Sequence, residues 1–406
     1  RAAKGLFEEE RHADRANQRC QPAPVHGGDN TAPSPRKTGY DAMTDVARGR
    51  TLVPKLSSLS RFTFVDVVLW ALRIGVVMVV VGGSVGTLIK GRYGAVQWFE
   101  FLVFGVTMGS VYALVALGYT MVYGVLRLIN FAHGDIMMTG AFSGYFVAAA
   151  FAGSGFLDRE PVLAMLAIVA VAVATSTTIA LLTERLAYRP FRHVRGLAPL
   201  ICAIGVSFFL EQTFRGAFGA GVRAYPDPKW QSGTLSVLGF GIPILQIMVV
   251  AAALVSMAVL YVIVQRTKMG TAMRAVSEDA DAAALMGIDV DKVVVFTFAL
   301  GGAMAGVAGV CYAFIFKQVY FYMGFTPGIK AFGAAVLGGI GSVPGAMLGG
   351  LFLGIVESVG PALFLDGIGI PAPYQLRDLI AFTLLIMVLI FRPYGILGER
   401  MAKKRA

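Results

Sequence analysis

The chain has 406 residues, of which 56% are hydrophobic and 15% are charged, and its mean hydropathy is +0.70. Uncharged runs longer than about 20 residues recur along it, and a helix of that length crosses a hydrocarbon core of about 30 Å. This pattern excludes a soluble globular domain and predicts an all-α polytopic membrane protein. The net charge of +11 would suit nucleic acid, but the cations gather in the tails and a few loops. The positive-inside rule explains that distribution, so we expect membrane lipid and no nucleic acid as a partner.

The N-terminal part differs from the rest of the chain. Residues 1–63 are polar without sustained hydrophobic periodicity, and we expect them to be disordered. The next segment, 64–95, contains the apolar run Val67–Ile89, in which Arg73 is the single charge. Such an arginine can extend its aliphatic stem toward the membrane edge. We predict an additional membrane helix here, and the apolar part of a long signal sequence is the alternative.

The apolar runs that follow predict membrane helices joined by short polar breaks. Clustered arginines in loop 184–196, cations after Gln265 and the basic tail 399–406 place these parts in the cytoplasm. Because the spans on either side fix the two ends of Lys317–Tyr374 to the same side of the membrane, this segment must cross an even number of times or re-enter without crossing. With the other predicted spans, the chain then has about eight to ten membrane segments. The predicted spans are Phe101–Leu126, Ile136–Leu157, Pro161–Thr183, Leu197–Leu210, Leu238–Gln265, Val293–Phe316 and Leu379–Phe391, with loop Glu211–Lys229 outside.

A polar island, Arg266–Lys292, separates two of these spans and must lie in water. We expect Ser277 to be the N-cap of a short helix whose acidic first turn suits the positive end of the helix dipole. Gly287 can take the left-handed conformation after the last turn. Asp279, Ala283 and Met286 have the spacing of one small, partly apolar helix face. That face could dock into a groove on a partner, or the island could be a solvated loop with one helical turn.

A second unusual stretch, Ala331–Val356, is apolar and rich in glycine. Gly338, Gly339, Gly341 and Pro344 interrupt any helix near its middle, and the freed backbone groups then need partners in protein or in a wet cavity. Most of these glycines would serve close helix packing in lipid. The alternative is a broken or re-entrant helix that lines a solute path. The ionisable Glu357 follows directly and is either a site residue within the membrane or a residue at its interface.

Catalytic and metal sites find no support in the sequence. No G-x-x-x-x-G-K-[ST] phosphate loop occurs, and the Gly339–Pro344 turn has proline where a dinucleotide site needs its third glycine. The four histidines are too dispersed for a zinc site. His133 beside Asp135 could relay protons or bond to loop backbone. We therefore expect no enzyme, no metal and no cofactor bound by this chain.

Several strings of residues, in order, resemble one family. They are Gly118–Gly124 with Asn130–Gly134, Ala187–Pro190, the polar island, Lys330–Phe332, Ala335–Gly350 and Arg392–Gly398. From about Gln97 to Gly398 the chain closely resembles the membrane permease subunit of the branched-chain amino acid ABC importers, and we take 96–398 as the permease domain. The first 96 residues lie outside the resemblance.

The resemblance implies a cytoplasmic coupling helix that receives a separate ATPase through an E-A-A-x-x-x-G core. Here Asp281–Gly287 is similar, with aspartate in place of glutamate, and the I-x-L-P ending of the wider pattern is missing. The implied coupling residues are Arg274, Ser277, Glu278, Asp279, Asp281, Ala282, Ala283 and Gly287. Candidates for the translocation path are Asn130, His133, Gly134, Gly339, Gly341 and Glu357.

The resemblance also implies an assembly in a bacterial inner membrane, with the C-terminus in the cytoplasm. The expected partners are ABC ATPase subunits that use ATP, a second homologous permease and a periplasmic or extracellular solute-binding protein. Alternating access driven by the ATPases would then move a branched-chain amino acid or a related solute. Urea and short-amide importers have very similar permeases. A facilitative channel and an ion-coupled transporter are the rival classes, and the latter would depend on Glu357.

Overall fold

The computed structural model describes residues 64–191, 194, 197–237, 239–392 and 395. The predicted disorder of 1–63 and the basic tail 399–406 lie outside the described residues. The chain divides into two units, residues 1–67 and 68–406, and the packing described below belongs to the second.

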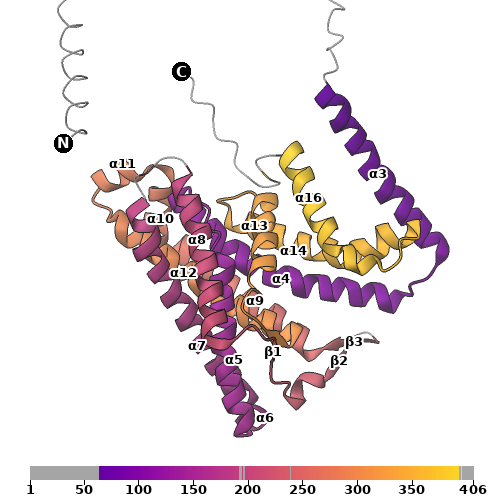
Figure 1. Cartoon of the computed structure of the whole chain (residues 1–406), viewed down its shortest axis with the longest axis horizontal. Helices are drawn as coiled ribbons and strands as arrows, with labels where there is room; N and C mark the ends of the chain where they lie inside the picture. The colour runs from indigo at the N-terminus through magenta and orange to yellow at the C-terminus, as the bar shows by residue number, and fades with distance from the viewer. Residues whose placement is uncertain (1–63, 192–193, 195–196, 238, 393–394, 396–406) are drawn as a thin grey trace, which may run out of the picture. The chain divides into compact units, whose positions relative to one another are not determined.

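The described part is mainly helical, as the hydrophobic runs predict (Figure 1). Eight of its helical stretches are long and apolar enough to cross a membrane. Most begin and end within a few residues of the predicted spans, because charged or proline-containing turns bound them. These helices are α3 Phe64–Lys90, α4 Ala95–Leu126, α5 His133–Gly153, α7 Pro161–Thr183, α9 Ile244–Arg266, α12 Val290–Phe316, α14 Val343–Gly360 and α16 Arg377–Phe391.

Shorter helices complete several of the spans and connect others. α7 continues through η1 Glu184–Tyr188 and η2 Arg189–Phe191, and α14 continues through η4 Pro361–Leu365 and α15 Asp366–Ile368. The remaining short helices are α6 Phe156–Arg159, η3 Lys229–Ser232, α10 Lys268–Glu278, α11 Ala280–Leu285, α13 Phe325–Gly338 and η5 Pro373–Leu376.

One predicted boundary is wrong. The span expected to end at Leu210 is helix α8, Ala198–Phe218, which continues for two more turns into the predicted external loop. Glu211, at the point where the span was expected to stop, is buried with 7% of its surface exposed. Contacts with the rest of the fold therefore stabilise helix where the charges alone predicted a loop.

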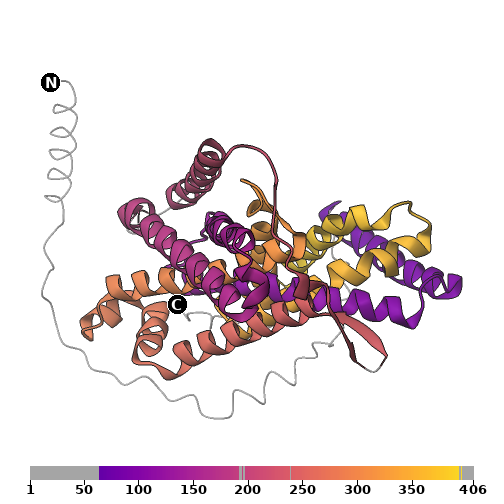
Figure 2. The same cartoon turned by 90° about the horizontal axis from the view of Figure 1, so that it is seen from below.

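Two small antiparallel sheets of two strands each lie in the connections. β1 Arg223–Ala224 pairs with β4 Gln318–Val319, and this pairing joins the segments that follow α8 and α12. β2 Thr234–Val237 pairs with β3 Phe240–Pro243 directly before α9. Figure 2 shows the β2–β3 hairpin projecting beyond the neighbouring helices.

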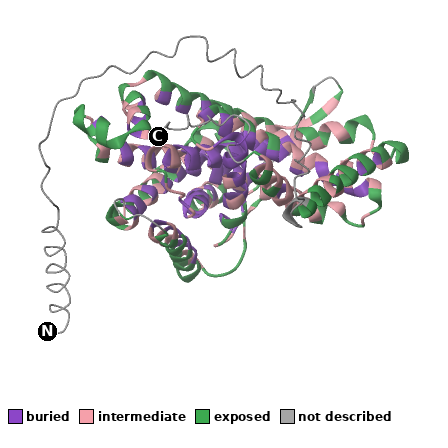
Figure 3. Cartoon of the chain, turned by 90° about the horizontal axis from the view of Figure 1, so that it is seen from above, coloured by how far each residue is buried: buried purple, intermediate pink, exposed green. Residues whose placement is uncertain are grey.

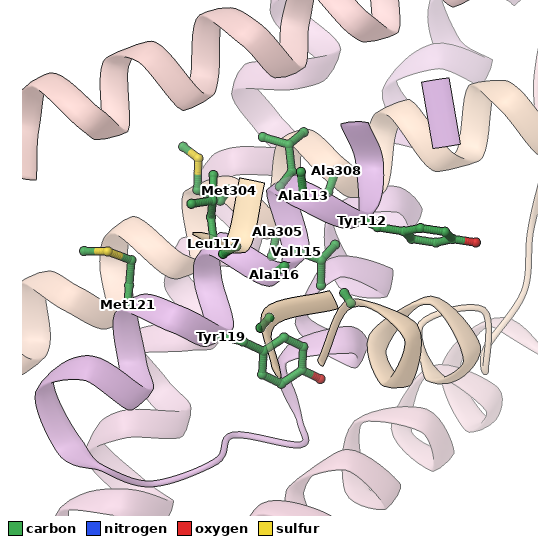
Figure 4. Close-up of a cluster of buried hydrophobic side chains, with 14 of the residues drawn as sticks. Tyr112, Ala113, Val115, Ala116, Leu117, Tyr119, Met121, Met304, Ala305 and Ala308 are labelled. Atoms are coloured by element: carbon green, nitrogen blue, oxygen red, sulfur yellow. The ribbon is translucent and has the colours of Figure 1, made fainter. Parts of the chain in front are cut away.

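The core lies where α4 packs against α12 and α14. Figure 4 shows buried α4 side chains such as Leu117 beside Met304 and Ala308 of α12. α14 approaches α4 through glycines, since a Cβ on Gly354 would lie 2.2 Å from the Gly109 nitrogen. Small residues at such contacts let helix backbones touch, which is how helices associate in lipid. In Figure 3 buried ribbon is concentrated in the middle of the helices and exposed ribbon at the periphery.

The glycine-rich stretch breaks where the sequence predicts. α13 ends at Gly338, and Gly339 and Gly341 have φ values of +104° and +100°, which favour glycine. Ser342 then caps α14, because its Oγ accepts a hydrogen bond from the Gly345 amide at 3.2 Å. The two helices run back close to each other, with the Cβ position of Gly338 only 1.9 Å from the Gly345 oxygen. A re-entrant course in the membrane stays a prediction.

Candidate functional site

The polar island folds into two short helices, α10 and α11, that connect α9 to α12. The predicted N-cap is wrong by two residues. Ser277 lies inside α10, where its Oγ donates to the Arg274 carbonyl at 2.7 Å. Asp279 is the N-cap of α11, since its carboxylate accepts from the amides of Asp281 and Ala282 at 3.0 Å each. A carboxylate suits this place better than a hydroxyl because it also faces the positive end of the helix dipole.

The first helix of this connector, α10, is fixed to the helix bundle by two arginines. Arg274 donates to the Val264 carbonyl and, at 3.3 Å, to the Gln265 side chain, so it ties α10 back onto α9. Arg127, which follows α4, donates to the Ser277 carbonyl at 2.9 Å. These bonds hold α10 against α9 and the end of α4, and α11 follows α10 directly.

The face that α11 presents outward differs from the predicted one. Ala283 is 5% exposed and belongs to the main hydrophobic core, so it does not share a surface with Met286. Leu285 and Met286 are instead 89% and 83% exposed. Gly287 has a φ of +83°, as predicted for a residue that ends the helix in the left-handed conformation. The connector thus offers two adjacent apolar side chains to solvent, with the acidic N-terminus of α11 close by. Among the predicted coupling residues, Glu278, Asp279, Asp281, Ala282 and Gly287 are exposed as well.

Three of the path candidates, Asn130, His133 and Gly134, lie in a buried cluster of polar side chains at the start of α5. Asn130 Oδ1 accepts from the Tyr188 hydroxyl at 2.8 Å, and the His133 ring lies edge-on to Tyr119 at 5.0 Å between centroids. Asn130 Nδ2 and His133 Nε2 are buried without hydrogen-bond partners among the described residues. Gly134 allows close approach, since its Cβ position would lie 2.4 Å from the Gly324 carbonyl oxygen. His133 is the first residue of helix α5 and so does not lie in a loop, as the simpler interpretation had it.

Asp135 was named beside His133 from the sequence, but the neighbours of Asp135 on α8 were missed. Asp135 is 1% exposed and accepts from the Ser207 hydroxyl of α8, and Glu211 of the same helix is also buried. Glu357 is consequently not the sole buried carboxylate in the described helices. The residues after Leu210 continue the helix without a proline, which could have indicated that Glu211 belongs to α8. The charge of Glu211 instead indicated the end of the span.

The remaining candidates lie elsewhere in the fold. Gly339 and Gly341 form the turn between α13 and α14, where the Cβ position of Gly395 would lie 2.5 Å from the Gly339 amide nitrogen. Glu357 lies near the other end of α14 and is 6% exposed. Its Oε1 accepts from the Lys330 ammonium of α13 at 2.6 Å. Lys330 donates equally closely, at 2.6 Å, to Asp378 at the start of α16.

Glu357 was predicted from the sequence as a candidate site residue, but its ion pair with Lys330 was not predicted. Lys330 lies alone between uncharged segments, and an isolated cation in a membrane segment indicates a carboxylate partner. That signal could have paired it with Glu357. The described residues contain no group of three or more histidine, cysteine or acidic side chains that could hold a metal ion.

Comparison with known proteins decides the family. The model of the family described as branched-chain amino acid transport system / permease component matches residues 101–389. The chain belongs to this family. It is 41% identical over 311 residues to the high-affinity branched-chain amino acid transport system permease protein BraD of Pseudomonas aeruginosa, covering 76% of this chain and 98% of that protein. It is 40% identical over 303 residues to the permease protein LivH of Escherichia coli strain K12, covering 74% and 95%.

The fold has distant likenesses among solved structures. One is PsaBC from Streptococcus pneumoniae in complex with Fab, at 15% identity and a TM-score of 0.40, covering 72% of this chain and 92% of that one. The family membership therefore depends on the sequence match, and it agrees with the eight membrane-length helices of the described part.

Proposed function

We propose that this chain is the transmembrane permease subunit of an ATP-binding-cassette importer for branched-chain amino acids. In this proposal the chain provides the path through the inner membrane, and separate ATPase subunits supply the work. A second permease chain completes the path, and a solute-binding protein delivers the solute from outside. The 40–41% identity to permeases named for branched-chain amino acid transport supports this solute class.

The connector α10–α11 is the proposed site for the ATPase. The single observation that carries this assignment is the exposed pair Leu285–Met286 at the end of α11, directly after α10, which is hydrogen-bonded to α9 and to Arg127. Two large apolar side chains in water favour a partner that covers them. Because Arg127 joins this connector to the end of α4, movement of the ATPase would pass directly to a helix of the core. In this orientation the end with α10 and α11 faces the cytoplasm, and so does the C-terminus after α16.

The test changes the proposed contact while leaving the fold intact. Burying a leucine or methionine side chain is worth about 1.5–3 kcal/mol, so two aspartates here should weaken ATPase binding at least about 100-fold. Leu285→Asp with Met286→Asp should abolish both co-purification of the ATPase and ATP-dependent leucine uptake. Leu285→Met keeps the apolar surface and should retain both. ATP-dependent uptake that survives the double aspartate change would contradict the proposed site.

The same assay separates the rival functions. A facilitative channel would pass solute without ATP, and an ion-coupled transporter would stop when the ion gradient is removed. Competition for leucine uptake by valine and isoleucine, and not by urea or acetamide, is the result expected of a branched-chain amino acid importer. The reverse order of competition would favour a urea or short-amide importer.

A further inference from the structure

A cavity opens at the end of α4 that lies away from the connector. It has a volume of about 420 Å³, within the range of about 300–1,000 Å³ usual for small-molecule sites. Its walls come from the start of α4, the β3–α9 junction, the end of α14 and the η5–α16 junction. Phe101 of this cavity lies 26 residues before Arg127, or about 39 Å along a helix at 1.5 Å per residue. The cavity is therefore a separate site from the proposed ATPase contact.

Much of the cavity wall is apolar. The α4 side contributes Phe104 and Met108, and the β3–α9 side contributes Ile242 and Pro243. These apolar side chains favour contact with a hydrocarbon group of the ligand, because they cannot form hydrogen bonds with a polar group. A ligand that fills this part would therefore carry an aliphatic or aromatic side chain.

The other part of the cavity wall carries opposite charges. Glu357 lines it with one oxygen bound to Lys330, while its buried Oε2 has no hydrogen-bond partner among the described residues. The Tyr112 side chain, whose ring lies 5.8 Å from the Lys330 ammonium, also interacts with the Glu357 carboxyl group. A buried carboxylate oxygen without a donor normally costs free energy, and a ligand ammonium could supply the donor.

A cation lines the same cavity. Arg377 is 42% exposed, and its Nε lies 3.8 Å from Glu357 and 3.6 Å from Asp378, beyond hydrogen-bond distance. Its guanidinium can therefore still receive a carboxylate, for which its planar donors have the right geometry. The ion cluster of Lys330, Arg377, Glu357 and Asp378 carries two positive and two negative charges, and Glu100, which also lines the cavity, is exposed to solvent. A ligand with no net charge keeps this balance, whereas a simple amine or acid would add an uncompensated buried charge.

We propose that this cavity binds the zwitterion of an apolar α-amino acid. Arg377 receives the ligand carboxylate, Glu357 Oε2 accepts a hydrogen bond from the ligand ammonium, and the apolar wall covers the side chain. The assignment deepens the proposed function and rests on it for the solute class, because it adds a solute site on the permease itself.

Direct binding to the purified full chain in lipid nanodiscs tests the chemistry. The probe is tritiated L-leucine, and the competitors are 4-methylpentanoate, which lacks the ammonium, and 3-methylbutylamine, which lacks the carboxylate. We expect saturable leucine binding and at least about tenfold weaker competition by each analogue, because each loses one charge-assisted contact. Equal competition by either analogue would overturn the zwitterion assignment.

Two pairs of variants locate the site. Arg377→Gln should weaken leucine binding at least about tenfold, while Arg215→Gln, at the exposed end of α8, should not change it. Val103→Trp should fill the cavity and abolish binding, whereas Leu102→Trp, on the neighbouring exposed position of α4, should not. Gel filtration checks that each variant is folded, and Arg377→Lys, which keeps the charge, should retain part of the affinity. Leucine binding unchanged in both Arg377→Gln and Val103→Trp would place the site elsewhere.

Uptake by the assembled transporter separates this inference from the proposed function. ATP-driven leucine uptake with unchanged leucine binding in both cavity variants would refute the cavity site and leave the function standing. Absence of branched-chain amino acid uptake by the unaltered assembly would refute the function, and direct binding would then decide the cavity on its own.

Discussion

We predict that loss of the Lys330 ammonium from its ion cluster strongly lowers the free energy of unfolding. Replacing Lys330 with methionine keeps an elongated side chain of similar size but removes the ammonium that lies 2.6 Å from both Glu357 and Asp378. Asp378 is 45% exposed and can turn to water, but Glu357 is 6% exposed and cannot. Removal of one partner from a buried pair costs about 3–5 kcal/mol, since the other charge stays buried. Among the described residues, Glu357 would keep only the Arg377 guanidinium as a cationic partner, with its Nε at 3.8 Å.

The pair itself should contribute much less than this. The double variant Lys330→Met, Glu357→Leu removes both charges, and replacing a buried pair by apolar groups is commonly neutral or stabilising. We therefore expect its free energy of unfolding to lie within about 1 kcal/mol of the unaltered chain, with a coupling energy above about 2 kcal/mol. SDS-induced unfolding, followed by tryptophan fluorescence, measures all four members of the cycle. Lys330→Met within about 0.5 kcal/mol of the unaltered chain, or a double variant as unstable as the sum of the single ones, would refute the reasoning.

Further predictions concern helix contacts and caps. Gly354→Leu should abolish the folded protein in gel filtration, because its Cβ position lies 2.2 Å from the Gly109 nitrogen; Gly75→Leu, with open space around it, should be tolerated. Asp279→Ala should destabilise α11 by about 1 kcal/mol and speed hydrogen exchange of its first amides. Ser277→Ala should leave those amides unchanged, since its hydroxyl bonds within α10; equal exchange in both variants would contradict the cap assignment.

The fold could be predicted wherever one physical requirement dominated. Runs such as Pro161–Thr183 must be helical to satisfy their backbone in lipid, and proline at the first position fixes where α7 begins. The end of α8 could not be predicted, because burial of Glu211 depends on neighbours that are distant in sequence. The helix break after Gly338 was predictable because glycine and proline act locally.

The sequence predicted where the α10–α11 connector lies along the chain, but not which face of α11 is exposed. The sequence located the connector between two spans and the left-handed Gly287. It could not show which side of α11 packs on the bundle, so Ala283 was assigned to the wrong face and Leu285 was missed. The pairing of Lys330 with Glu357 likewise depends on α13 and α14 folding back on each other.

Helix α4 is longer than a membrane-spanning helix needs to be, and its length has a mechanical consequence. Its 32 residues correspond to about 48 Å, well beyond a hydrocarbon thickness of about 30 Å. One end borders the cavity beside Phe101, and the residue after the other end, Arg127, is hydrogen-bonded to the connector. A lever of this length, locked to α14 through touching backbones, would convert a small tilt at one membrane surface into a larger sideways displacement at the opposite surface.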